Sequence, residues 1–193
     1  MNNRRLFNAF NKLEIAAKDS NVKVVIMGGL AVSIYAQPRA TLDIDGIIEL
    51  DERDIGNFLT SVEKRGFSWD KEIPVKKIKG LPFITLYYPD GKVYVDLFLA
   101  KGDFQENVIR RSHAVNVEGV KLDLISPEDL ILVKLISDRP KDTEDVRQIL
   151  LESSEDLDYK YLEKWSGKLG VLQFLKGEMR SLKDRISHYK VHF

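Results

Sequence analysis

Two aspartates stand inside an apolar segment, and they constrain the possible folds more than any other feature of the sequence. Asp43 and Asp45 lie in TLDIDGIIEL (residues 41–50), whose alternation of apolar and polar residues predicts a β-strand. Residues two apart on a strand point to the same face. Neighbouring carboxylates repel each other unless a cation lies between them, and unpaired charge among apolar side chains is costly. Alone, Asp-x-Asp is a weak indication of a metal site because it occurs by chance in many loops.

A third acid repeats this pattern further along the chain. Asp96 stands among apolar residues in KVYVDLFLA (residues 92–100), a second segment that predicts a strand. Three carboxylates on two strands can converge if the strands are neighbours in one sheet. Oxygen ligands of this kind suit Mg²⁺, or Mn²⁺ in its place. The alternative for Asp96 is a structural acid held by a hydrogen bond or an ion pair.

The remaining pattern predicts an α/β (α+β) protein with an α/β core in residues 1–125 and a helical C-terminal region in residues 126–193 packed on it. Ser126 is placed as an N-cap with Pro127 at the first helical position, and the chain is expected to be helical from there onward. The expected helices of the core are 4–18, 30–37 and 51–65, and its expected strands are 22–27, 41–50, 81–88, 92–100, 113–117 and 120–124.

Composition excludes several classes of protein. The chain has no cysteine and three histidines, which removes disulfides and thiolate chemistry and argues against a zinc cluster. No segment resembles a signal peptide or a membrane span, so we expect a cytoplasmic protein that does not engage a membrane. Thirty basic residues balance thirty acidic ones. The balance is uneven locally, because residues 159–193 hold eight Lys or Arg against three acids. This basic tail is either a solvated amphipathic helix or a surface for a polyanion such as RNA.

The residues before the first two acids carry a resemblance to a known family. Gly28-Gly29 joins a predicted strand to a predicted helix, and Arg39 and Thr41 add a cation and a hydroxyl where an anionic substrate would lie. The stretch GGLAVSIYAQPRATLDID (residues 28–45) resembles the opening motif of the nucleotidyltransferase superfamily, which has the polymerase-β-like fold. Its form looks most like the AbiEii-type branch, which includes toxins of toxin–antitoxin systems.

The resemblance implies a mixed sheet flanked by helices and a division of roles among the residues. Asp43 and Asp45 would bind metal, Asp96 would be the third carboxylate, and Gly28 and Gly29 would hold the triphosphate. Two Mg²⁺ ions would then support transfer of a nucleoside monophosphate from a nucleoside triphosphate to an acceptor hydroxyl. RNA, with a tRNA end foremost, is one acceptor that the branch implies, and an antitoxin protein is a possible partner.

Lys134 is a single cation in the apolar segment LILVKLIS, and two interpretations are open. Asp142 and Asp145 tend toward the inner side of the next predicted helix, so Lys134 or Arg139 could join them in a structural ion-pair network. The resemblance instead implies that Lys134 faces the nucleotide phosphates, with Asp142 as a second active-site or supporting acid.

Two other functions compete with nucleotidyl transfer. One is a non-catalytic nucleotide-binding or interaction protein of the same fold, which would have no reason to place three carboxylates on one face. The other is a metal-dependent phosphohydrolase or nuclease, which also uses clustered acids. The glycines ahead of the acids favour triphosphate binding, and no histidine lies near the acids in the sequence to serve as a general base.

Overall fold

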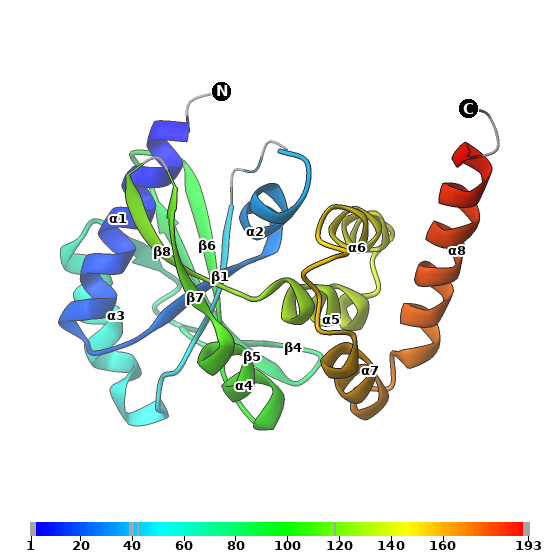
Figure 1. Cartoon of the computed structure of the whole chain (residues 1–193). Helices are drawn as coiled ribbons and strands as arrows, with labels where there is room; N and C mark the ends of the chain where they lie inside the picture. Colours follow the sequence, from blue (N-terminus) through cyan, green and yellow to red (C-terminus); the bar gives the residue numbers. More distant parts are fainter. Residues whose placement is uncertain (1–2, 39–40, 42, 118, 191–193) are drawn as a thin grey trace. The chain divides into compact units, whose positions relative to one another are not determined.

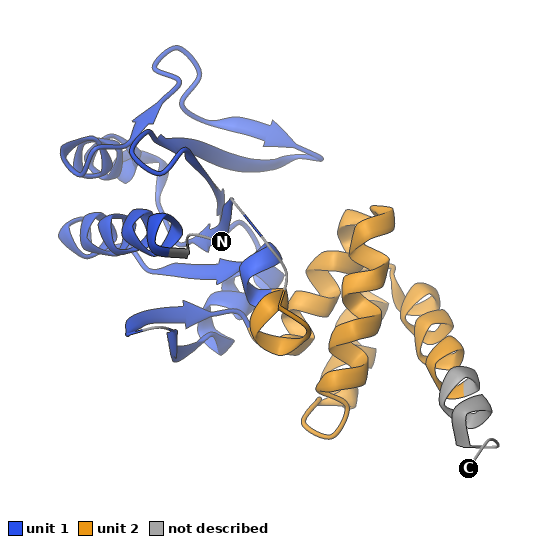
Figure 2. Ribbon diagram, turned by 90° about the horizontal axis from the view of Figure 1, so that it is seen from above, with its two compact units in different colours: residues 1–31, 39–125 blue, residues 32–38, 126–193 orange. Residues whose placement is uncertain are grey.

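The computed structural model describes residues 3–38, 41, 43–117 and 119–190 of the chain (Figure 1). They form two compact units (Figure 2). The first unit comprises residues 1–31 and 39–125, and the second comprises residues 32–38 and 126–193. Helix α2 (Gly28–Tyr35) begins in the first unit and ends in the second.

The first unit is built on a mixed sheet. Among the described residues, eight strands form it in the order β3-β5-β6-β2-β1-β8-β7, with β4 paired to β5. The pairs β2–β6 and β1–β8 are parallel, and the other pairs are antiparallel. The strands are β1 (Val24–Met27), β2 (Ile44–Ile48), β3 (Ser68–Trp69), β4 (Lys76–Ile78), β5 (Leu81–Tyr88), β6 (Val93–Leu99), β7 (His113–Val117) and β8 (Val120–Leu124).

The two faces of the β5–β6 region differ in burial. Both strands alternate, so that Ile84, Leu86, Val95 and Leu97 are fully buried on one face. Helices α1 (Asn3–Asp19) and α3 (Ile55–Lys64) lie side by side over this face, as Figure 1 shows. The residues that alternate with these buried ones along β5 and β6 lie on the opposite face. They are half-buried or exposed, and Asp96 is one of them. One hydrophobic core therefore lies under α1 and α3. On the opposite face Val25 and Ile47 are buried as well, whereas the positions of β5 and β6 on that face are half-buried or exposed.

The predicted mixed α/β sheet is confirmed, and several elements differ from the prediction in bounds or presence. The helix predicted at 30–37 begins at Gly28, so the two glycines form its first turn and do not precede it. Helix α4 (Asp103–Arg111) and the short strands β3 and β4 were not predicted. Phe104 and Val108 are buried at helical spacing in α4, but the segment is only nine residues long. A helical pattern of apolar residues over so few positions does not distinguish a helix from a loop.

The second unit is helical in its described residues, with α5 (Pro127–Ser137), α6 (Pro140–Glu152), α7 (Tyr159–Lys168) and α8 (Leu172–Lys190) following the end of α2. None of the helices in the described ranges is long and apolar enough to cross a membrane. The predicted N-cap is confirmed, because the Ser126 hydroxyl accepts a hydrogen bond from the Asp129 backbone N–H at 3.2 Å. The same hydroxyl donates to Asp129 Oδ2 at 3.0 Å, and the Tyr161 hydroxyl donates to Oδ1. This network satisfies a carboxylate that is 0% exposed.

Replacing Ser126 should destabilise the protein more than an ordinary surface substitution. Ser126→Ala removes the cap of α5 and one hydrogen bond to the buried Asp129, so we expect a loss of about 1–2 kcal/mol in the free energy of unfolding. Urea unfolding followed by circular dichroism measures it. Ser154→Ala, at an exposed serine between α6 and α7, is the matched control. Equal stability of the two variants would show that the cap contributes nothing.

Candidate active site

Two of the predicted acids lie opposite each other in the sheet. Strands β2 and β6 pair in parallel, with Asp45 in register with Asp96. Residues in register on neighbouring strands share a face, and neighbouring strands are about 4.8 Å apart. Both side chains are half-buried, on the face opposite α1 and α3. This arrangement brings together two oxygen donors of the kind that Mg²⁺ prefers.

Gly28 is fitted to the carboxylate of Asp45. It has φ of +63°, a left-handed conformation that glycine adopts without cost. A Cβ placed on Gly28 would lie 1.9 Å from Asp45 Oδ2 and 2.6 Å from its Cγ. The Asp45 side chain therefore occupies the space that any other residue at position 28 would need. The sequence argument gave the glycines a role in phosphate binding but missed this close approach, because only the pairing of β1 with β2 brings the two residues together.

The Asp96 carboxylate is held from the other side. Thr85 on β5 is in register with Asp96, and its hydroxyl donates to Asp96 Oδ1 at 2.7 Å. Sequence reasoning did not single out Thr85. Its signal is that it is the small polar residue in a row of half-buried positions on β5 otherwise made of Leu81, Phe83 and Tyr87.

The other residues predicted upstream of the acids are placed differently. Asp43 is exposed and lies one residue before β2, where its backbone carbonyl accepts a hydrogen bond from the Thr41 hydroxyl at 3.2 Å. Gly29 is in the first turn of α2, and Arg39 lies outside the described residues. Within the described ranges, no group of three or more His, Asp or Glu side chains is arranged to hold a metal ion. Convergence of Asp43 with Asp45 and Asp96 on one ion stays a prediction.

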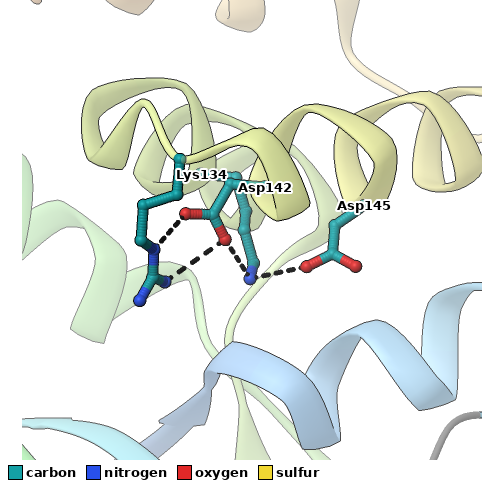
Figure 3. Close-up of polar contacts among 4 residues, drawn as sticks. Lys134, Asp142 and Asp145 are labelled. Atoms are coloured by element: carbon teal, nitrogen blue, oxygen red, sulfur yellow. Dashed lines mark hydrogen bonds and ion pairs between the residues drawn. The ribbon is translucent and has the colours of Figure 1, made fainter.

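Lys134 lies in a buried ion-pair cluster within the helical unit (Figure 3). Its ammonium is 2.7 Å from Asp142 Oδ1 and 2.7 Å from Asp145 Oδ2. Arg139 Nε donates to Asp142 Oδ2 at 2.6 Å. The side chains of Lys134, Asp142 and Asp145 are 5%, 1% and 6% exposed, so the cluster ties α5 to α6 in a nearly water-free setting. The predicted ion-pair network is thus present, and contact of Lys134 with a nucleotide stays a prediction.

The cluster controls the charge state of Asp142. Burial by itself would raise the pKa of this carboxyl, but hydrogen bonds from Arg139, Lys134 and Ser137 outweigh burial and lower its pKa to about 2. Asp142 is therefore ionised at any physiological pH.

Comparison with known proteins identifies the family. Residues 4–176 match the family described as nucleotidyltransferases of unknown function (DUF6036). The chain belongs to this family. The superfamily inferred from the glycines and acids is therefore confirmed at this level. No curated protein is similar enough in sequence to count as a match.

Solved structures show that this nucleotidyltransferase shares its fold with antibiotic-modifying enzymes. The solution structure of the antibiotic-resistance factor ANT(2″)-Ia is 17% identical, with 100% of each chain covered and a TM-score of 0.55. Its crystal structure with adenylyl-2″-tobramycin is 18% identical over 83% of this chain and 94% of that chain, also with a TM-score of 0.55. The lincosamide antibiotic adenylyltransferase LnuA, bound to lincomycin, is 16% identical over 76% and 94%, with a TM-score of 0.52. At these identities the likeness concerns the fold alone.

Gly28→Ala should test the fit between Gly28 and Asp45 in this nucleotidyltransferase. The positive φ costs an alanine roughly 1–2 kcal/mol, and its Cβ must also displace the Asp45 side chain. We therefore expect a loss of at least about 1–2 kcal/mol in urea unfolding. Gly56→Ala is the matched control, because Gly56 lies on an exposed part of α3 with open space around its Cα. It should leave stability unchanged or raise it, since alanine favours helix. A Gly28→Ala protein as stable as the wild type would contradict this packing.

The low pKa of Asp142 predicts a particular dependence of stability on pH. Because the folded pKa lies below the ordinary value of 3.8, the ion pairs contribute fully above that value and are lost as pH falls toward about 2. Urea unfolding between about pH 6 and pH 2 should show this loss in the wild type. Asp142→Asn should be less stable near neutral pH and should show a shallower fall on acidification. The exposed acid Asp156 offers a control in Asp156→Asn, which should keep the wild-type profile. Parallel profiles for Asp142→Asn and the wild type would contradict the assignment.

Proposed function

We propose that this protein is a Mg²⁺-dependent nucleotidyltransferase that moves a nucleoside monophosphate from a nucleoside triphosphate to an acceptor hydroxyl. The observation that carries the proposal is the register of Asp45 with Asp96 on the face of the sheet opposite the core, with Gly28 against Asp45. Membership of a nucleotidyltransferase family supports it.

The donor set fits a hard divalent cation. Asp45 and Asp96 are adjacent carboxylates, and the space against the Cα of Gly28 is filled by the Asp45 side chain. These two residues would hold Mg²⁺ or Mn²⁺, with Asp43 as the third ligand. A cation held there would neutralise phosphate charge and lower the pKa of a hydroxyl bound to it. Asp96 is the residue that we assign to orient the acceptor hydroxyl.

The triphosphate is assigned to the start of α2. The N-terminus of a helix carries the positive end of its dipole and favours phosphate oxygens, so we assign Gly28 and Gly29, at the start of α2, to the triphosphate. The absence of side chains lets phosphate oxygens approach the backbone of these glycines closely. We assign Arg39 and Thr41 to the same anionic substrate, on the basis of their place in the sequence between α2 and β2.

The role of Lys134 depends on its ion pairs. Asp142 and Asp145 accept two of the three N–H bonds of its ammonium, so a phosphate would take the third or displace one carboxylate. In our proposal Lys134 contacts the β and γ phosphates in the nucleotide-bound protein, and Asp142 supports it. The charge of the cluster in the absence of nucleotide is balanced, with Arg139 as the second cation.

An RNA acceptor is the substrate that we favour, in the toxin–antitoxin setting of the AbiEii-type branch, with an antitoxin protein as partner and the cytoplasm as location. Its support is the basic character of the last two helices. Six basic side chains of α7 and α8 are exposed, namely Lys160, Lys164, Lys168, Lys176, Arg180 and Lys183. Phe174 is 58% exposed and could stack on a base, whereas Trp165 is 9% exposed and belongs to the core of its unit. The non-catalytic and phosphohydrolase alternatives are outcomes of the test below.

The test is transfer of label from a nucleotide. ATP, CTP, GTP and UTP carrying ³²P at the α position are each incubated with the protein, Mg²⁺ and total tRNA, protein extract or a small-metabolite pool. We expect label in one acceptor pool together with release of pyrophosphate. Asp45→Asn and Asp96→Ala should lower the rate by at least about a hundredfold, because each removes a ligand of the cation that would stabilise the transition-state charge. Asp156→Asn, which alters an exposed acid of the helical unit, should transfer label like the wild type.

Other outcomes separate the alternatives. In a parallel series with ³²P at the γ position, movement of the γ label without the α label would mark a phosphotransferase. Free nucleoside monophosphate or diphosphate without a labelled acceptor would favour the phosphohydrolase. No transfer to any acceptor pool and no nucleotide hydrolysis would favour the non-catalytic protein, whether or not it binds nucleotide.

A further inference from the structure

Asp96 lies between two polar side chains that come from opposite sides of its strand. In the sheet order β5-β6-β2, Thr85 is in register with Asp96 on one side and Asp45 is in register with it on the other. Register on neighbouring strands places all three side chains on one face. The Thr85 hydroxyl donates to Asp96 Oδ1 at 2.7 Å, and among the residues that the structure describes it is the one hydrogen-bond partner of that carboxylate.

This hydrogen bond restricts how the carboxylate can turn. Threonine is β-branched and has few χ1 rotamers, and the ladder between β5 and β6 fixes the backbone of Thr85. Oδ1 is therefore held on the β5 side. Oδ2 is the oxygen that this hydrogen bond leaves unused, so it would be the more available of the two to a cation held by Asp96 and Asp45.

Aromatic pairs enclose this hydrogen bond along the strands. Phe83 and Phe98 stack at 5.5 Å on one side, and Tyr87 and Tyr94 pack at 5.0 Å on the other. Each pair joins a β5 residue to a β6 residue two positions from Thr85 or Asp96. The Thr85–Asp96 hydrogen bond therefore lies between two aromatic pairs on the same face of the sheet.

We propose that Thr85 is a positioning residue that sets the orientation of the third carboxylate for metal binding. The proposal rests on the proposed function, because it assigns Asp96 to the metal. Thr85 itself touches neither substrate nor metal and acts through Asp96. Partners that orient metal ligands in this way typically change metal affinity or activity by about 10–100-fold when they are removed.

The test compares two substitutions at this position with Mn²⁺ as the probe. Thr85→Val keeps the shape and loses the hydroxyl, whereas Thr85→Ser keeps the hydroxyl. We expect Thr85→Val to weaken Mn²⁺ binding by about tenfold or more, measured by calorimetry and by the paramagnetic resonance of free Mn²⁺, and Thr85→Ser to restore most of it. In the transfer assay Thr85→Val should lower kcat with little change in the KM for nucleotide. Thr60→Val is the matched control, because the Thr60 hydroxyl donates to a backbone carbonyl on an exposed turn of α3.

The outcomes separate this proposal from the proposed function. Mn²⁺ binding by the wild type that is lost in Asp45→Asn upholds the metal site, and wild-type affinity in Thr85→Val would then overturn only the positioning role. A wild type that binds no Mn²⁺, with or without nucleotide, overturns both. Urea unfolding must show that Thr85→Val is folded. A metal-free crystal structure of Thr85→Val gives a second readout, in which Asp96 should adopt another rotamer; an unchanged rotamer with unchanged affinity overturns the proposal.

Discussion

The parallel pairing of β2 with β6 is the interaction on which the candidate site depends. It sets Asp45 opposite Asp96 and runs in unbroken register from Ile44 opposite Val95 to Ile48 opposite Leu99. A slip of β2 by one residue against β6 would turn Asp45 toward the buried face, because side chains alternate along a strand. That face holds Leu97 and other fully buried residues, so a slipped register would bury a carboxylate without a partner. The hydrophobic core under α1 and α3 therefore fixes which side of the sheet carries the acids.

Placing two carboxylates side by side has a cost that the neighbouring strands help to offset. Thr85 supplies a hydrogen bond to Asp96 from β5. On the opposite side, Gly28 makes room for the Asp45 side chain at the junction of β1 and α2. Each neighbour acts on a single acid, and each comes from a different strand or helix. The position of the two acids therefore depends on β1, β2, β5 and β6 together. A bound cation would remove the repulsion between the two carboxylates that remains.

The helical unit contains buried charges that are paired with one another. Lys134 is buried against two carboxylates, and Arg139 adds a second cation to Asp142. Two positive and two negative groups balance, which makes burial of the charges tolerable. Such a cluster adds little stability over an apolar one of the same shape, but losing one member leaves an uncompensated buried charge. Its contribution is therefore to specify how α5 packs against α6. In the proposed contact with phosphate, the Lys134 ammonium would share its positive charge between the two carboxylates and the phosphate.

By itself, the sequence determined the mixed α/β class, the cap of α5 by Ser126 and the presence of lone acids in apolar strands. These follow from local periodicity and from the cost of burying charge, which a linear pattern records. The sequence also indicated that Lys134 needs acidic partners, but it left open whether a nucleotide takes their place. Three contacts depend on how the strands pair in the folded protein: Asp45 faces Asp96, Gly28 lies against Asp45, and Thr85 donates a hydrogen bond to Asp96. Strand order and register join residues tens of positions apart, and nothing in the local pattern of either strand encodes which strand becomes its neighbour.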